Sequence, residues 1–173
     1  MKKVFLMLAI AASVMLTGCG KGDGNNAAGD SAAVEAVAGP DTIKLNSASS
    51  SGEFFKVLGC KSDDIILTKG AEAGDQVEVT MMVTLESREP MDVKEIEMCK
   101  ASLSYRDASG NSADVTPLDL DKGEYEGVMA MIKEGKEGNA KAFKFTGKMP
   151  KAEIEALKGA EARFLNLTSV HLK

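Results

Sequence analysis

The stretch Gln76–Glu86, QVEVTMMVTLE, decides the fold class of this chain. Apolar residues fall on every second position of it, and they are Val77, Val79, Met81, Val83 and Leu85. The polar positions between them are Glu78, Thr80, Thr84 and Glu86, with Met82 as the exception. A period of two is typical of a strand that buries one face and leaves the other in water. The stretch therefore predicts a half-buried antiparallel strand.

The same period continues through most of the chain from residue 53 onward. Residues 142–146 alternate likewise, with Phe143 and Phe145 expected inward and Lys144 outward. A turn rich in Gly and Asn at 106–111 predicts a hairpin between strands at 102–105 and 113–115. Further strands are expected at 54–59, 64–68, 93–98, 127–132 and 161–171.

One short helix is expected over residues 150–159. Pro150 stands near its first position and Gly159 just past its end, which is the favoured asymmetry. Ile154 and Leu157 are three residues apart and would hold this helix against the sheet. Many short strands with frequent turns and one late helix indicate a mainly β fold, a single antiparallel β-sandwich.

The carboxyl-terminal part, residues 143–170, has the sequence FKFTGKMPKAEIEALKGAEARFLNLTSV. It resembles the strand–short helix–strand ending of immunoglobulin-like domains in bacterial lipoproteins of unknown function. The resemblance is confined to this pattern, so it implies an immunoglobulin-like fold and no particular function. The chain has no Trp, and the buried Trp of antibody-type domains is therefore absent.

The amino-terminal residues 1–19, MKKVFLMLAIAASVMLTGC, are typical of a targeting segment. Lys2 and Lys3 precede an apolar run that is short for a membrane-spanning helix. The tetrapeptide Leu16-Thr17-Gly18-Cys19 resembles the bacterial lipobox at all four positions. The resemblance implies that Cys19 receives a diacylglycerol, that cleavage falls before it and that the new amino terminus is acylated. The alternative is an ordinary secretory signal with an incidental cysteine.

These features predict three segments: a lipoprotein signal peptide at 1–18, a lipidated flexible tether at 19–52 and a β-sandwich domain at 53–173. The tether is dominated by Gly, Ala, Asn and Ser, which bring too little apolar bulk for a core. Ser31 and Thr42 each follow an Asp and precede a small or apolar residue. This pattern resembles an acceptor of protein O-glycosylation in one Gram-negative phylum. Both residues are candidate glycosylation sites, with a chance match as the alternative.

The charge of the chain argues against nucleic-acid binding. The full chain has 21 basic and 26 acidic residues, a net charge of −5. Lys2 and Lys3 leave with the signal, so the mature chain has 19 basic against 26 acidic residues, or −7. Such a surface repels nucleic acid and anionic headgroups.

Two cysteines, Cys60 and Cys99, remain after lipidation of Cys19. Export places them in an oxidising compartment, where they can pair. A bridge that closes a loop of about 40 residues would contribute roughly 4 kcal/mol in the chain-entropy model. Both stand beside apolar, strand-like runs, so two buried free thiols are the alternative. A catalytic thiol is not expected because His171, the only histidine, lies near the carboxyl end.

No motif of a nucleophilic, phosphate-binding or zinc enzyme occurs in the sequence. We therefore expect no catalytic residue and no cofactor. Oxygen-rich loops suit calcium, and one acidic cluster offers weak candidates for such a site. They are Asp119, Asp121, Glu124 and Glu126. The cluster departs from the EF-hand pattern, and a solvated loop is the alternative.

The sequence as a whole favours a non-enzymatic binding or accessory module of the cell envelope. The lipid on Cys19 would hold it to a membrane, and its partner would be an envelope protein or a small ligand that the sequence does not identify. By resemblance to enterobacterial sorting, Gly20 implies the outer membrane. A Gram-positive source would place the protein on the outer face of the cell membrane. The alternatives are a structural component that pairs through a strand edge, and an enzyme or metal binder built on the acidic loop.

Overall fold

The computed structural model describes residues 39–52 and 54–173, without the side chains of residues 54–55 and 169–171. This part of the chain is mainly β. Its strands are β1 (Asp41–Lys44), β2 (Ser47–Ser50), β3 (Leu58–Cys60), β4 (Asp64–Ala73), β5 (Gln76–Ser87), β6 (Ile96–Arg106), β7 (Ser112–Asp114), β8 (Leu118–Leu120), β9 (Ala140–Pro150) and β10 (Ala162–Leu172). Its helices are α1 (Phe54–Val57), the 3-10 turn η1 (Lys122–Glu124), α2 (Tyr125–Glu134) and α3 (Lys151–Gly159).

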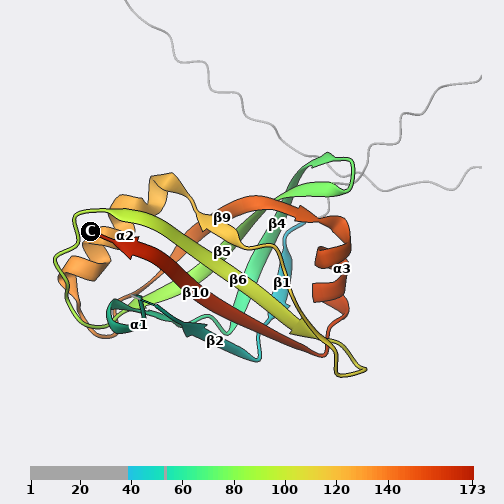
Figure 1. Cartoon of the computed structure of the whole chain (residues 1–173), viewed down its shortest axis with the longest axis horizontal. Helices are drawn as coiled ribbons and strands as arrows, with labels where there is room; N and C mark the ends of the chain where they lie inside the picture. Colours follow the sequence, from blue (N-terminus) through green and yellow to red (C-terminus); the bar gives the residue numbers. More distant parts are fainter. Residues whose placement is uncertain (1–38, 53) are drawn as a thin grey trace, which may run out of the picture. The chain divides into compact units, whose positions relative to one another are not determined.

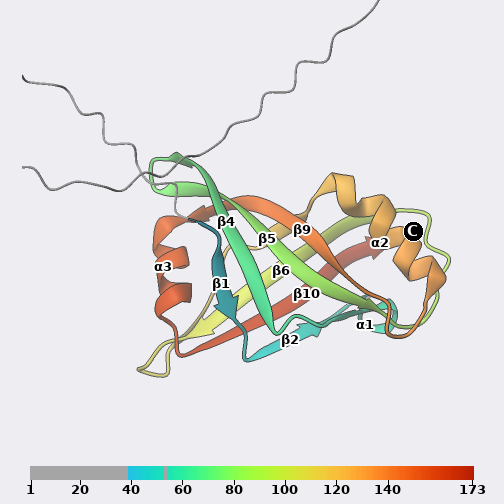
Figure 2. The same cartoon turned by 180° about the vertical axis from the view of Figure 1, so that it is seen from behind.

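The strands form one curled sheet in the order β1-β4-β5-β9-β8-β6-β10-β2 (Figures 1 and 2). Two short strands lie off this path, because β3 pairs with β5 and β7 pairs with β6. Consecutive strands β1 and β2 lie at opposite ends of the order: β1 is antiparallel to β4, and β2 is parallel to β10. The segment 41–50 therefore joins both ends of the sheet, which curls around a single apolar core.

The core confirms the alternation read from the sequence. Val77, Val79, Met81, Val83 and Leu85 are all buried along β5. Burying them removes a large apolar area from water, which is the main favourable contribution to folding.

Strand β9 lies antiparallel to β5 along its whole length and adds two aromatic rings to the same core. Phe143 and Phe145 are buried, whereas the ammonium of Lys144 lies on the outer face. The hairpin prediction is confirmed as well, since β6 pairs with β7 and Tyr105 lies opposite Ala113. Asp107 stabilises the turn by accepting hydrogen bonds from the backbone N–H groups of Ser109 and Asn111.

Helices α2 and α3 lie at opposite ends of the curled sheet (Figure 1). The predicted helix is confirmed as α3, which buries Ile154 and Leu157. Arg163 completes the last turn of α3, because its guanidinium donates hydrogen bonds to the carbonyls of Leu157 and Lys158. No helix in the described ranges is both long and apolar enough to cross a membrane.

The prediction of a strand at 127–132 was wrong, because these residues belong to α2. Val128, Met131 and Ile132 are buried at the three- and four-residue spacing of a helix. Gly135, at φ +52°, ends the helix in the left-handed conformation. The expected strand at 54–59 is likewise divided between α1 and β3.

The expected antiparallel, immunoglobulin-like sandwich with one short helix is not confirmed. The sheet is mixed rather than purely antiparallel, and the described chain has three α-helices. Strand β8 also connects what would be two sheets, since Asp119 pairs with both Lys100 of β6 and Thr146 of β9.

The predicted end of the tether at residue 52 was too late. Residues 41–44 and 47–50 lie in β1 and β2. Composition missed these strands because, apart from Ile43, their residues are polar or small, and only pairing with β4 and β10 makes them strands. Ile43 is buried, and the buried Ser50 hydroxyl donates a hydrogen bond to the carbonyl of Leu58.

Candidate binding surface

The structure does not gather the acidic cluster into a group of metal ligands. In the part of the chain that the structure describes, no three metal-ligating side chains come together. The four candidate carboxylates lie on three elements, with Asp119 on β8, Asp121 before η1, Glu124 in η1 and Glu126 in α2.

Two of these carboxylates have basic partners. Asp119 lies 3.1 Å from the ammonium of Lys100, and Asp121 lies 3.1 Å from that of Lys144. A hydrogen bond from the backbone N–H of Gly123, with Lys144 beside it, holds the pKa of Asp121 below its ordinary value.

The two cysteines are free thiols, which is the alternative to a disulfide. Cys60 is half-buried on β3, and Cys99 is buried on β6. Burial raises the pKa of both thiols, and the Asp119 carboxylate raises that of Cys99 further. A thiol with a raised pKa stays protonated at neutral pH and is a poor nucleophile.

Some of the remaining predicted site residues lie outside the residues that the structure describes, and others lie within them. Cys19 and Ser31 lie outside the described residues, so lipidation and glycosylation at these positions stay predictions. Thr42 is exposed on β1, within a paired strand rather than a tether. His171 belongs to β10 opposite Met98, and its side chain lies outside the described ones.

The outer face of the sheet has a continuous polar row that crosses five adjacent strands, β4, β5, β9, β8 and β6. Its members are directly opposite one another in register, and they are Thr68, Thr80, Thr146, Asp119 and Lys100. At the ordinary spacing of strands, such a row extends about 19 Å. We call this set the polar row. It offers three hydroxyls, one carboxylate and one ammonium on one surface.

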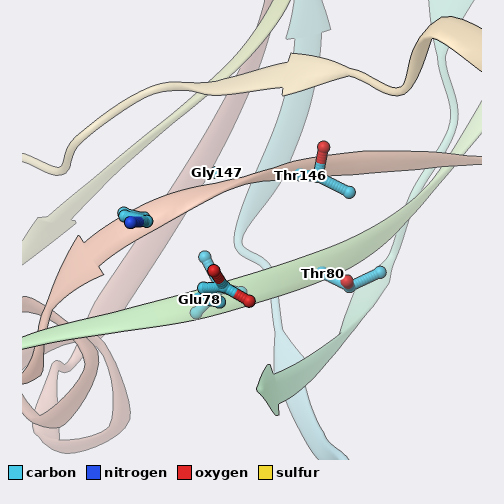
Figure 3. A pocket seen from close by; sticks show the side chains of 6 residues that line it. Glu78, Thr80, Thr146 and Gly147 are labelled. Carbon is cyan, nitrogen blue, oxygen red and sulfur yellow. The ribbon is translucent and has the colours of Figure 1, made fainter. Parts of the chain in front are cut away.

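The row is hollowed where β5 meets β9 (Figure 3). This shallow depression has a volume of about 300 Å³ and is lined by residues of these two strands. Glu78 and Lys148 lie opposite each other at its edge, and both are exposed. Figure 3 shows Glu78 and Thr80 on one strand and Thr146 on its neighbour. Groups of both charges therefore flank the hydroxyls.

A glycine in β9 lets the sheet pack closely beneath this depression. A Cβ atom on Gly147 would lie 2.8 Å from a methyl carbon of Leu118, which is buried on β8. Leu118 thus fills the space that a larger residue would need, and it places β8 and the adjoining Asp119 beside β9.

A second opening lies beside β1, between this strand and the start of β10. It has a volume of about 340 Å³. Its lining residues are Asp41, Thr42, Ile43, Lys44, Lys158 and Arg163. We call it the β1 groove.

The outer edge of β4 beyond β1 is protected. A bulge between Lys69 and Glu72 interrupts its regular pairing with β5. Both side chains are also engaged by α3, since Lys69 pairs with Glu155 and Glu72 with Lys151. Bulges and charges are devices that prevent pairing at an edge.

Comparison of the chain with protein-family models, with curated proteins and with solved structures found no match. The geometry of the described residues is therefore the basis for any assignment. The alternation of β5 indicates that Thr80 is a polar position on a strand, but no local pattern in the sequence reveals the polar row. Its members are far apart in the sequence, and only the register of five strands brings them together.

Proposed function

We propose that this protein is a lipid-anchored component of a bacterial cell envelope whose β domain acts as a non-enzymatic binding or accessory module. The lipobox Leu16–Cys19 supports the anchor. The polar row is the single observation that supports binding. An outer membrane location, favoured by Gly20, belongs to the same proposal.

The chemistry of the polar row suits recognition of a polar surface. Each Thr hydroxyl both donates and accepts a hydrogen bond, the carboxylate of Asp119 accepts and the ammonium of Lys100 donates. The groups are mounted on adjacent paired strands, so little conformational entropy is lost when a partner contacts them. The partner would be an envelope protein or a small polar ligand.

Site-specific photo-crosslinking in intact cells tests this proposal. A photoreactive residue replaces Thr80 at the centre of the polar row, and the control replaces Ser112, which is exposed on β7. We expect a discrete adduct from position 80 and none from position 112. Equal adducts from both positions, or none from position 80, would refute the polar row as a binding surface.

The finer fold assignment, an immunoglobulin-like domain, also stays a proposal. The strand–helix–strand ending formed by β9, α3 and β10 supports it, as does the segment 41–50, which pairs with both ends of the sheet. An experimental structure in which two sheets face each other, without ladder bonds through β8, would support it. A closed single sheet would refute it.

The second candidate function is that of a structural component that pairs through a strand edge. One observation favours it: the side of β1 that faces the β1 groove has no paired strand among the described residues. The edge of β1 is thus open, whereas the outer edge of β4 is protected. A photoreactive residue in place of Thr42, whose side chain is exposed on β1, tests this function in cells, because edge pairing would yield an adduct with a partner protein.

A further inference from the structure

The hydrogen bonds of β1 show which of its backbone groups are already used. The N–H of Leu45 donates to the carbonyl of Asp63, which lies directly opposite in the register of β1 and β4. In an antiparallel pair, such hydrogen-bonded positions alternate with positions whose N–H and C=O point the other way. Ile43 and Asp41 therefore bond to β4, whereas Thr42 and Lys44 present their backbone groups to the β1 groove.

A second hydrogen bond, which involves β5 rather than β1, independently supports this assignment of the backbone groups of β1. The N–H of Lys61 donates to the carbonyl of Thr84, so the even-numbered residues of β5 bond toward β3 and β4. Ile66, which lies opposite Met82, then bonds to β5. The odd-numbered neighbours of Ile66 bond to β1, in agreement with the assignment above.

The groove is closed at both ends by contacts between β1 and the opposite wall. At one end, Asn46 donates its N–H to the carbonyl of Arg163 and accepts the N–H of Arg163 on its side-chain oxygen, each at 2.8 Å. At the other end, the ammonium of Lys158 lies 2.7 Å from the carboxylate of Asp41. Between these ends, the length of β1 matches that of a strand of about three to four residues.

The charges around the groove favour an acidic occupant. Three cations line it, namely Lys44, Lys158 and Arg163, against the carboxylate of Asp41, and Glu155 lies 3.9 Å from the ammonium of Lys158. In a chain with a net charge of −5, the residues that line the groove thus carry an excess of cations. Lys44 pairs with Asp64, but its side chain is 76% exposed, and such surface pairs exchange partners at little cost.

We infer that the β1 groove binds an extended acidic segment of a partner protein, which adds to the free edge of β1 as a strand. The backbone groups of Thr42 and Lys44 hold the segment, and the cations select its acidic side chains. This inference rests on the second proposed function, pairing through a strand edge, and it names the edge and the chemistry of the partner.

Binding of synthetic peptides to the purified full-length protein in detergent tests the inference. The probe is an end-blocked peptide of alternating Thr and Glu, and the matched control has Lys in place of every Glu. We expect saturable binding of the Glu peptide alone. Equal binding of both peptides, or binding of neither, would overturn the inference.

Methylation of the peptide nitrogens tests the strand geometry separately. One derivative is methylated at every Thr nitrogen and the other at every Glu nitrogen. Only one set of N–H groups faces β1 in a strand, so one derivative should bind like the parent and the other should not. Loss of binding in both derivatives, or in neither, would contradict pairing along a single edge.

Two pairs of variants locate the site on the protein. Thr42→Pro removes an N–H that the ladder with β4 does not use, and proline is tolerated at such edge positions. We expect about fivefold weaker binding from the loss of one hydrogen bond, and unchanged binding for Thr42→Ala. Lys44→Glu should also weaken binding, whereas Lys61→Glu, a reversal of another exposed lysine, should not.

Lys44→Glu leaves the backbone intact and decides the test even if Thr42→Pro lowers stability. If neither Thr42→Pro nor Lys44→Glu changes the affinity for the peptide, the inference is overturned. The cellular crosslink from position 42 reports separately on the proposed function. If the peptide binds but no cellular adduct forms, the proposed assembly through this edge is refuted. Binding of an acidic strand in the β1 groove would still be supported.

Discussion

Substitution of Gly135 tests how α2 is held at its end of the sheet. Gly135 ends α2 at φ +52°, and a Cβ atom there would overlap the backbone nitrogen of Pro90. Pro90 cannot retreat easily, because its neighbours are bonded on both sides: Glu89 donates its N–H to the carbonyl of Lys56 and Met91 to that of Ile132. The substitution Gly135→Ala thus combines backbone strain with a steric clash.

Gly138 provides a matched control in the same loop. It also has a positive φ, +81°, but nothing lies within 4 Å of a Cβ built there. Left-handed backbone costs an L-residue about 1–2 kcal/mol, which both substitutions share. Overpacking adds about 1–3 kcal/mol at Gly135 alone. We therefore expect Gly138→Ala to lower the free energy of unfolding by about 1–2 kcal/mol and Gly135→Ala by about 2–5 kcal/mol.

Urea unfolding followed by circular dichroism measures both values, and Asn separates the two contributions. Asn tolerates the left-handed conformation better than Ala but has the same Cβ atom. Gly138→Asn should therefore be nearly neutral, whereas Gly135→Asn should stay destabilising. Equal losses at the two positions would refute the reasoning, because the contact with Pro90 would then contribute nothing.

Four further predictions follow from the sequence and the structure. Cys19→Ala should abolish incorporation of a labelled fatty acid, and labelling that persists in the variant would disprove lipidation at this residue. Because burial raises the pKa of the Cys60 and Cys99 thiols, Ellman's reagent should react with them slowly in the native protein and rapidly in urea; a melting temperature that falls in reductant would instead indicate a disulfide. Phe145→Ala should lower the free energy of unfolding by about 3–5 kcal/mol, whereas Thr80→Ala on the outer face should change it by less than about 0.5 kcal/mol; similar losses would contradict the assignment of the two faces. The pKa of Asp121 is lowered in the folded state, so its stabilising effect is present above the ordinary value of 3.8 and is lost as the pH falls through the folded value. Asp121→Asn should therefore lower the free energy of unfolding at neutral pH but not at pH values well below this range. A loss of stability that is independent of pH would contradict this.

The sequence alone determined the elements whose signal is local. The alternation in Gln76–Glu86 and at Phe143 and Phe145 predicted two central strands with their buried faces, because each strand displays its own period of two. Helix α3 was predicted for the same reason. Pro150 and Gly159 mark its ends, and Ile154 and Leu157 are three residues apart. The acylation of Cys19 stays a prediction from a local motif.

Tertiary structure alone decided the features that depend on pairing between distant segments. Residues 41–50 read as a tether by composition, and they become β1 and β2 because both ends of the sheet offer them unpaired backbone groups. The residues of α2 read as a strand from their apolar content, but the helix buries Val128, Met131 and Ile132 together at its end of the sheet. The polar row exists only through register, which long-range backbone hydrogen bonds set across five strands. No local pattern in the sequence encodes those bonds.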